Sequence, residues 1–377
     1  MTEMIDLLSQ LVAIDSVNPD LVPGAAGEGE IAGFVAEWLE RAGLEIHVQE
    51  AGLGRPNVIG IVRGTGGGRS LMLNAHMDVV STAGMSGGWG PRVEGARLYG
   101  RGSWDMKGSL AAIMLAGADL AKNPPRGDVL ITAVVDEEFA SIGTAAIVEE
   151  WSADAAVVTE PTAMQIGVAH KGFVWIDIET FGIAAHGSRP HQGVDAIAKM
   201  GHVLVGIEEL DRSLRTGAGH PLLGTGSIHA SLIDGGSELS SYPARCLLRA
   251  ERRTIPGERV AVVEGQIVDI VRGLAAKDPN LRAEVRVGLS RAPFEVSMDQ
   301  PIVQLLQNRA AAAMGRTPSP IGESGWMDSA LLSSAGIPTV IFGPRGEGAH
   351  SAVEWVDLND LDQCRKIYVD TAREFCG

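Results

Sequence analysis

Cysteine is scarce in this chain of 377 residues. The three cysteines, Cys246, Cys364 and Cys376, are scattered and none of them stands in a CxxC spacing. A disulfide framework and a zinc site built from thiolates are therefore excluded. Unpaired cysteines are typical of a reducing compartment, so we expect a cytoplasmic protein.

Basic residues are also few. The chain has 31 lysines and arginines against 47 aspartates and glutamates, which gives a formal net charge of −16 at pH 7. No basic stripe interrupts this excess, so phosphate groups of a nucleic acid or an anionic membrane would be repelled. We expect neither as a partner.

Long hydrophobic runs are missing as well. The N-terminal segment MTEMIDLLSQLVAIDSVNPD mixes acids and apolar residues at helical spacing, without a basic region or an apolar block of signal or membrane-spanning length. Internal repeats and low-complexity segments are not apparent either. The sequence therefore indicates a soluble globular protein, and its length predicts two domains.

Short apolar runs of similar shape recur along the chain. Each is apolar enough to be buried on both faces, as strands of a parallel sheet are. Helical patterns lie between them, so we predict an α/β domain with a mostly parallel sheet flanked by helices. The runs are LMLNAH, DVLITAVVDEE, ADAAVVTEP and IPTVIFGP.

The middle of the chain has a different pattern. From about Gly172 to Leu289, apolar and polar residues alternate in long runs such as FVWIDIETFG and LRAEVRVGL, with two helical patterns between them. Such alternation is typical of an antiparallel sheet with one solvated face. We predict an α+β domain at residues 172–291 that interrupts the first domain, which then comprises 1–171 and 292–377.

Imidazoles and carboxylates follow the predicted parallel strands where each strand ends. Since the carboxyl ends of parallel strands meet at one edge of the sheet, we expect these side chains to converge. Taken singly, each is more typical of a turn or a helix cap, but together they predict a centre for zinc or a similar divalent ion. The residues are His76, Asp78, Glu137, Glu138, Glu160 and His350, with Asp105 from a loop that leads into a helix.

This number of ligands is too large for one ion. Two ions about 3.5–4 Å apart that share a bridging carboxylate would use them all. The adjacent Glu137 and Glu138 point in different directions, so one can bind metal while the other faces the attacking water. Asp78 is spaced to accept the second N–H of the His76 imidazole. Asp136 is interpreted as a turn acid.

Two glycine-rich motifs carry no chemistry in this interpretation. GMSGG, Gly84 to Gly88, matches the G-x-S-x-G of serine hydrolases but does not lead into a helix. GTGGGRS precedes a strand, whereas a dinucleotide-binding motif would follow one. We predict a hairpin turn there.

Several motifs occur in the order of a known family: HMDVV, LYGRGSWDMKGSLAA, VVDEEFASIGT, VVTEPT, AAHGSRPHQGVDAI, RRTIPGE and GAHSAVEWV. Over nearly its whole length the chain resembles the metallopeptidases and amidohydrolases typified by acetylornithine deacetylase, succinyl-diaminopimelate desuccinylase, aminoacylase and glutamate carboxypeptidase. The resemblance implies a zinc-binding α/β domain interrupted by an α+β lid that commonly mediates dimerisation. A homodimer is therefore expected.

The resemblance also implies a set of metal ligands. Asp105 would bridge two zinc ions, for which cobalt could substitute. His76 and Glu160 would complete one site. Glu138 and His350 would complete the other.

Further roles follow from the same resemblance. Glu137 would be the general base toward a metal-activated water, and Asp78 the partner of a ligand imidazole. His186, in AAHGSRP, matches a lid histidine that stabilises the oxyanion in the neighbouring subunit of dimeric relatives. Arg253, in RRTIPGE, matches an arginine often associated with the substrate's carboxylate. Ser240, three residues before Pro243, stands where many relatives carry asparagine, so a substrate hydrogen bond is expected to be lost or replaced.

The resemblance implies hydrolysis of the amide bond of an N-acyl amino acid. A dipeptidase or glutamate-carboxypeptidase-like activity is the alternative, and a metal-binding scaffold without catalysis is a hypothesis from another class. The motifs do not identify the acyl group or the amino acid. Arg345, in GPRGEGAH, and Trp326, in GESGWMDS, depart from the family pattern. They either reshape the substrate pocket or reflect variation of a surface loop.

Overall fold

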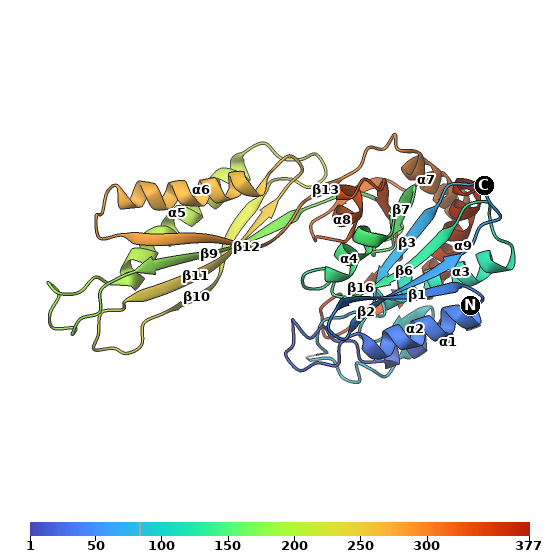
Figure 1. The fold of residues 1–377 in the computed structure, drawn as a ribbon, viewed down its shortest axis with the longest axis horizontal. Helices are drawn as coiled ribbons and strands as arrows, with labels where there is room; N and C mark the ends of the chain where they lie inside the picture. The colour runs from blue at the N-terminus through green and yellow to red at the C-terminus, as the bar shows by residue number, and fades with distance from the viewer. Residues whose placement is uncertain (83) are drawn as a thin grey trace. The chain divides into compact units, whose positions relative to one another are not determined.

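The computed structural model describes residues 1–82 and 84–377, which form two compact units (Figure 1). Unit 1 comprises Met1–Val168, Val296–Ile321 and Met327–Gly377. Unit 2 comprises Ala169–Glu295 and Gly322–Trp326. All residues of the predicted metal centre lie in unit 1.

A large mixed sheet forms the centre of unit 1. Its strands are β1 (Glu45–Gly52), β2 (Arg55–Val62), β3 (Leu71–His76), β6 (Val129–Val134), β7 (Ala155–Val158), β8 (Ile166–His170) and β15 (Thr339–Ile341), and the short β13 (Phe294–Glu295) and β14 (Pro320–Glu323) pair with β8. The order is β1-β2-β6-β3-β7-β15-β8. The four middle strands, β6, β3, β7 and β15, pair in parallel. The predicted α/β class is confirmed, but antiparallel strands flank the parallel ones on both sides.

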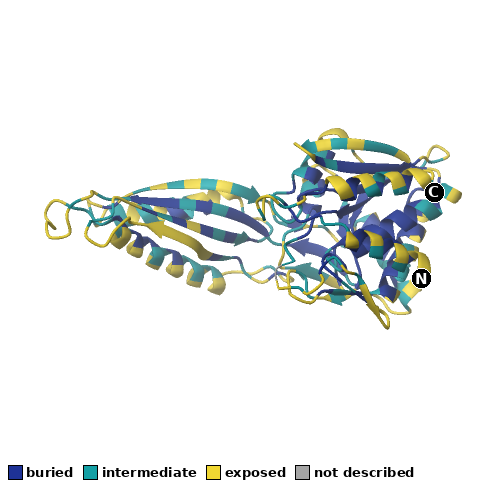
Figure 2. Ribbon diagram, turned by 90° about the horizontal axis from the view of Figure 1, so that it is seen from below, coloured by how far each residue is buried: buried dark blue, intermediate teal, exposed yellow. Residues whose placement is uncertain are grey.

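Helices cover both faces of this sheet and bury its middle strands along their entire length (Figure 2). On one face, alternate β3 residues such as Leu71 and Leu73 share a core with α1 (Thr2–Ala13), α2 (Gly29–Arg41), α3 (Lys107–Lys122), α7 (Pro301–Met314) and α9 (Leu358–Phe375). On the other face, Asn74 donates a hydrogen bond to Thr144 of α4 (Ile142–Glu150), which contacts α8 (Ser329–Ser334). The apolar runs predicted as buried strands are thus buried as expected.

The glycine-rich loop GTGGGRS between β2 and β3 is not a hairpin turn, so that prediction was wrong. β2 and β3 lie on either side of β6, antiparallel and parallel to it, respectively. The strand that separates them comes later in the chain, after α3, so local sequence could not reveal it.

A small antiparallel sheet in unit 1 brings together two of the loops that carry predicted ligands. Its strands are β4 (Arg92–Glu94), β5 (Arg97–Tyr99), β16 (Gly346–Glu347) and β17 (Trp355–Asp357), in the order β16-β17-β5-β4. Tyr99, at the end of β5, pairs with Trp355, at the start of β17. The segment after β5, which carries Asp105, therefore starts beside the segment before β17, which carries His350.

Unit 2 is an antiparallel sheet with helices packed on one face. Its strands are β9 (Gly172–Phe181), β10 (Ser227–Gly235), β11 (Arg245–Thr254) and β12 (Arg282–Arg291), in the order β10-β11-β9-β12. Alternate residues such as Ile176 and Leu248 form a core with α5 (Ala196–Thr216) and α6 (Val260–Ala275). Among the described residues, no helix combines the length and apolar character needed to cross a bilayer.

Candidate metal centre

The middle strands deliver the predicted residues to one edge of the central sheet. β3 ends at His76, whose register partner is Val134 at the end of β6. Glu137 and Glu138 follow β6 in the chain, and Glu160 follows β7. Because β3, β6 and β7 are parallel neighbours, their carboxyl ends meet at this edge.

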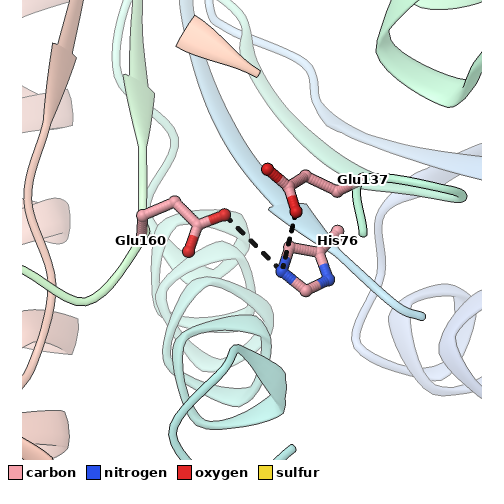
Figure 3. A group of neighbouring side chains, drawn as sticks. All are labelled: His76, Glu137 and Glu160. Atoms are coloured by element: carbon pink, nitrogen blue, oxygen red, sulfur yellow. Dashed lines mark ion pairs between the residues drawn. The ribbon is translucent and has the colours of Figure 1, made fainter. Parts of the chain in front are cut away.

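One group of side chains surrounds His76, which is 1% exposed. Its Nε2 atom lies 3.3 Å from Asp105 Oδ1, 3.5 Å from Glu160 Oε1 and 3.8 Å from Glu137 Oε2. Figure 3 shows the carboxylates of Glu137 and Glu160 both directed at this nitrogen. The other ring nitrogen, Nδ1, lies 2.9 Å from the backbone carbonyl oxygen of Asp78. Since a carbonyl only accepts, Nδ1 carries a proton, which leaves Nε2 as the atom that would bind a metal ion.

A second group surrounds His350. Its Nε2 atom lies 2.9 Å from Glu138 Oε2 and 3.6 Å from Asp105 Oδ2. The two oxygens of Asp105 thus face different imidazoles, one toward His76 and one toward His350. Asp105 does not cap α3, whose N-cap residue is Met106. The carboxylate is free to serve the two groups at once.

The carboxylate of Asp78 holds the turn that carries the two adjacent glutamates. It accepts hydrogen bonds from the backbone N–H groups of Glu137 at 3.0 Å and Glu138 at 3.2 Å, and from the side chain of Asn18 at 2.8 Å. The carboxylate oxygen Oδ1 of Asp78 lies 3.5 Å from His76 Nδ1, whereas the backbone carbonyl oxygen of Asp78 lies 2.9 Å from the same nitrogen. Asp78 therefore acts on His76 mainly through its backbone and on the glutamates through its side chain.

Asp136, interpreted from sequence as a turn acid, is fully buried and adopts a left-handed backbone conformation with φ of 68°. Its carboxylate accepts hydrogen bonds from Asn18 and from Arg55 Nη1, each at 2.9 Å. Arg55 also pairs with Glu28 and with Asp20. Asp136 thus anchors the turn that positions the two following glutamates, which is why an acid stands at this buried position.

The charges of the centre fit a divalent cation. Burial raises the pKa of Glu137 and that of Glu160 well above the usual range. The charges of Asp328 and Glu138 raise both pKa values further. Burial and Asp105 raise the pKa of Glu138 to about 7. Buried carboxylates that cannot ionise easily beside one another are stabilised when a cation lies among them. Imidazole nitrogen and carboxylate oxygen are also the ligand types that zinc accepts.

Two residues predicted to act from the lid lie together in unit 2. His186 is exposed, and its Nδ1 accepts hydrogen bonds from the backbone and hydroxyl of Ser188. The backbone N–H of Gly187 donates to the carbonyl of Ser240 at 2.7 Å, so these segments run side by side. Ser240 is also exposed.

Arg253, the third residue predicted to act from the lid, belongs to an aromatic and cationic cluster of unit 2. Its Nε donates to Glu251 at 2.7 Å, and its guanidinium lies 5.6 Å from the ring centre of Phe173. Phe173 makes an edge contact with Trp326, whose indole N–H donates to the carbonyl of Ala292. Trp326 is therefore packed within unit 2 beside Arg253 and is more than a variable loop residue.

Arg345 has a structural partner. Its guanidinium binds both carboxylate oxygens of Asp360 at 2.5 and 2.7 Å, and its backbone N–H donates to the same carboxylate. This interaction ties the loop before His350 to the first turn of α9. A contribution of Arg345 to the substrate pocket finds no support in this geometry.

The model of peptidase family M20/M25/M40 matches residues 72–374. The chain belongs to this family. The predicted resemblance is thereby confirmed, and the M20 protein is an amidohydrolase or metallopeptidase that acts on linear amide bonds.

Three similar proteins illustrate the range of the M20 family. The acetylornithine deacetylase of Myxococcus xanthus is 28% identical over 98% of this chain and 97% of its own length. A Staphylococcus aureus tripeptidase is 22% identical with a TM-score of 0.83, over 100% of this chain and 98% of that one. A dinuclear metal-binding peptidase of Bacillus subtilis is 17% identical with a TM-score of 0.75, over 100% of this chain and 98% of that one. The two structures show that the fold is shared.

Sequence reasoning left two carboxylates of this M20 protein without a role. Asp328 is 1% exposed, accepts a hydrogen bond from Thr144 at 2.7 Å and has its pKa raised to about 6 by burial. Glu354 is 2% exposed and bonds to the backbone of Asp105. Both lie in motifs that were visible in the sequence, GESGWMDS and GAHSAVEWV, but their burial was not.

Proposed function

We propose that the protein hydrolyses the amide bond of an N-acyl amino acid, as an acetylornithine deacetylase-like deacylase with two zinc ions. The observation that carries the proposal is the position of Asp105, whose two oxygens face the imidazoles of His76 and His350 while Glu137 lies beside them. A carboxylate shared by two groups is the arrangement that a two-metal hydrolase requires. The similarity to the Myxococcus deacetylase over nearly the whole chain supports the choice of a deacylase.

In this proposal the two groups of side chains hold one ion each. His76 and Glu160 would hold the first ion, Glu138 and His350 would hold the second, and Asp105 would be shared by both. When bound, two divalent ions lower the pKa of water toward 7 and polarise a carbonyl group. Cobalt accepts the same nitrogen and oxygen ligands and could replace zinc.

Glu137 moves the proton in this scheme. Its carboxylate accepts a proton from the attacking water and passes it to the nitrogen of the leaving amine. Its carboxylate lies 3.8 Å from His76 Nε2, close enough to the first group to reach a water bound there. Asp78 keeps Glu137 in place through the backbone N–H.

The lid residues complete the proposal. His186 would donate a hydrogen bond to the oxyanion of the tetrahedral intermediate. Ser240, exposed beside the His186 segment, would take the place of the substrate-binding asparagine of relatives. Arg253 would bind the substrate's carboxylate, because its bond to Glu251 occupies Nε and leaves its Nη groups as donors.

Replacing Arg253 by methionine tests the carboxylate contact. We expect kcat/KM for N-acetyl amino acids to fall about 10–100-fold, because a hydrogen bond to a charged group contributes roughly 1.5–3 kcal/mol. Substrates whose α-carboxylate is amidated should be hydrolysed equally by both enzymes. Arg249→Met is the control, since Arg249 lies on the same strand and is 58% exposed. An equal loss on both substrate types would remove Arg253 from carboxylate recognition.

A homodimer through unit 2 is also part of the proposal. β10 is an edge strand and exposes Leu232 and Ile233, which are 62% and 55% exposed, and Val205 on the adjoining α5 is 54% exposed. An edge strand with apolar neighbours offers unpaired backbone groups to a second copy.

The double variant Val205→Lys, Leu232→Lys tests the dimer proposal. We expect its self-association to weaken at least about 100-fold, because like charges replace two buried apolar contacts of roughly 1.5–3 kcal/mol each. Sedimentation velocity across a concentration series measures this change. Val48→Lys, on the 62% exposed Val48 of unit 1, is the control and should leave the mass unchanged. A double variant that sediments like the wild type would exclude this surface.

The cytoplasmic location we propose is supported by three free, buried cysteines.

A screen of N-acyl amino acids and dipeptides with zinc- and cobalt-loaded enzyme tests the function. A deacylase will release acid from N-acetyl amino acids faster than it cleaves dipeptides. The reverse order would favour the dipeptidase or carboxypeptidase alternative. A metal-loaded protein inert toward both classes would favour a binding scaffold.

A further inference from the structure

Glu354 lies at the junction of the loops that carry the candidate ligands. Its side chain is 1% exposed, and that of its ion-pair partner Arg101 is 2% exposed. The two oxygens of Glu354 accept four hydrogen bonds, all from the segment that runs into Asp105. The donors are Arg101 Nη1 at 2.7 Å and the backbone N–H groups of Gly102 at 3.0 Å, Trp104 at 3.0 Å and Asp105 at 3.1 Å.

Arg101 extends these contacts to two other loops. Its Nη2 donates to the carbonyl of Ser351, next to His350, at 2.9 Å. Its Nε donates to the carbonyl of Ser81, in the loop that follows β3 and His76, at 3.0 Å. One guanidinium and one carboxylate therefore connect the loops after β3, before α3 and before β17. The loops before α3 and before β17 carry Asp105 and His350, and the loop after β3 begins directly after His76.

We propose that the Arg101–Glu354 pair is a positioning device that sets the spacing of the two metal ions, and this proposal rests on the two-metal function proposed above. The pair fixes the backbone of Asp105, whose carboxylate must reach both ions. It also fixes the backbone beside His350, which serves the second ion alone. Each proposed site has one ligand outside the reach of the pair: Glu138 in the second site and Glu160, which follows β7, in the first. The sites differ in their imidazoles, because Arg101 binds the residue next to His350, whereas its contact nearest to His76 is at Ser81, five residues along the chain. The second site is therefore expected to depend more strongly on the pair.

The chemistry of the pair requires an ionised carboxylate. Four N–H donors converge on two oxygens, which an amide cannot accept because its NH₂ group would face donors. Glu354→Gln keeps the volume of the side chain but removes half of the acceptors and the negative charge beside Arg101. The loops are then expected to lose their common anchor while the remaining core is unchanged.

Cobalt titration of the apo-protein, followed by calorimetry and by the visible absorption of bound cobalt, tests the proposal. Wild type should bind two ions, and Glu354→Gln should bind the second at least about 10-fold more weakly, as loss of outer ligand partners commonly costs 10–100-fold in metal affinity. Arg101→Lys, which keeps the charge but cannot reach three loops, should weaken the second ion in the same direction. At limiting cobalt kcat should fall with KM unchanged, and added cobalt should restore it.

A matched control separates positioning from general loss of stability. Glu179→Gln removes another buried carboxylate, 8% exposed, that binds Arg245 and Arg286 in unit 2. Thermal unfolding of each apo-variant shows that it is folded. Glu179→Gln should lose stability and still bind two ions. Equal weakening of the second ion in Glu179→Gln, or wild-type affinities in folded Glu354→Gln, would overturn the proposal.

Failure of the proposed function gives a different result. If wild type binds two ions but hydrolyses no N-acyl amino acid, the function is wrong, and the metal titration still decides the role of Glu354. If wild type binds fewer than two ions, both proposals are overturned together.

Discussion

Glu137→Ala is expected to bind two metal ions with unchanged stoichiometry and to lose about 10²–10⁴-fold in kcat, the usual contribution of a general acid–base group. His76, Glu137 and Glu160 lie close enough to share an ion, but the proposed ligands of the first site are His76, Asp105 and Glu160, and all three remain in this variant. Removing Glu137 leaves the water without a proton acceptor of suitable pKa. The measurement is kcat for an N-acetyl amino acid, together with metal content by elemental analysis.

Glu138→Ala is the matched control. Glu138 is the same type of residue, adjacent in the chain, and its backbone N–H is held by the same carboxylate of Asp78. Its Oε2 atom lies 2.9 Å from His350 Nε2, the other ligand proposed for the second site alone, so its loss should remove an ion. If Glu137→Ala loses metal and Glu138→Ala retains two ions, the two roles are reversed.

Asp105→Asn is expected to have the second large effect, with at most one ion bound and turnover near background. The amide keeps the shape of the side chain but has a single acceptor oxygen, so it cannot face His76 and His350 with a lone pair on each side. In the proposed assignment both sites share this carboxylate, whereas every other ligand serves one site. Isothermal titration with zinc or cobalt counts the ions, and the activity assay follows turnover.

Asp119→Asn controls for the loss of a carboxylate on the adjoining helix. Asp119 lies on α3 and pairs with Lys122 and Arg365 away from the centre. This variant should bind two ions and keep its activity. Two ions of wild-type affinity in Asp105→Asn would show that another group bridges them.

The sequence was most informative where function and fold depend on the same strands. The strands β3, β6 and β7 were predicted because continuous apolar runs indicate burial on both faces of a sheet. Such runs are visible in the local sequence alone. Their convergence followed from the rule on carboxyl ends, which is why His76 and Glu160 could be expected near one another from sequence. In the structure, His76 Nε2 lies 3.5 Å from Glu160 Oε1.

The parts that were missed depend on contacts between distant segments. Asp136 can be buried because Arg55, which is distant in the sequence on β2, donates a hydrogen bond to its carboxylate. No local sequence pattern encodes that pairing. Glu354 lies within a quoted motif, but its four donors come from the segment around Asp105. The hairpin prediction for GTGGGRS failed for the same reason, since the strand β6 that separates β2 from β3 is supplied by a later part of the chain.

The two imidazoles of the centre differ in their access to solvent. The side chain of His76 is 1% exposed, and that of His350 is 56% exposed. A ligand at the surface exchanges readily with water, whereas a buried one must wait for the surrounding structure to open. The centre would therefore lose and regain its ions in sequence, the His350 ion within ordinary exchange times and the His76 ion far more slowly. Purified enzyme would then tend toward a half-loaded form, and the metal present during an assay would decide the activity observed.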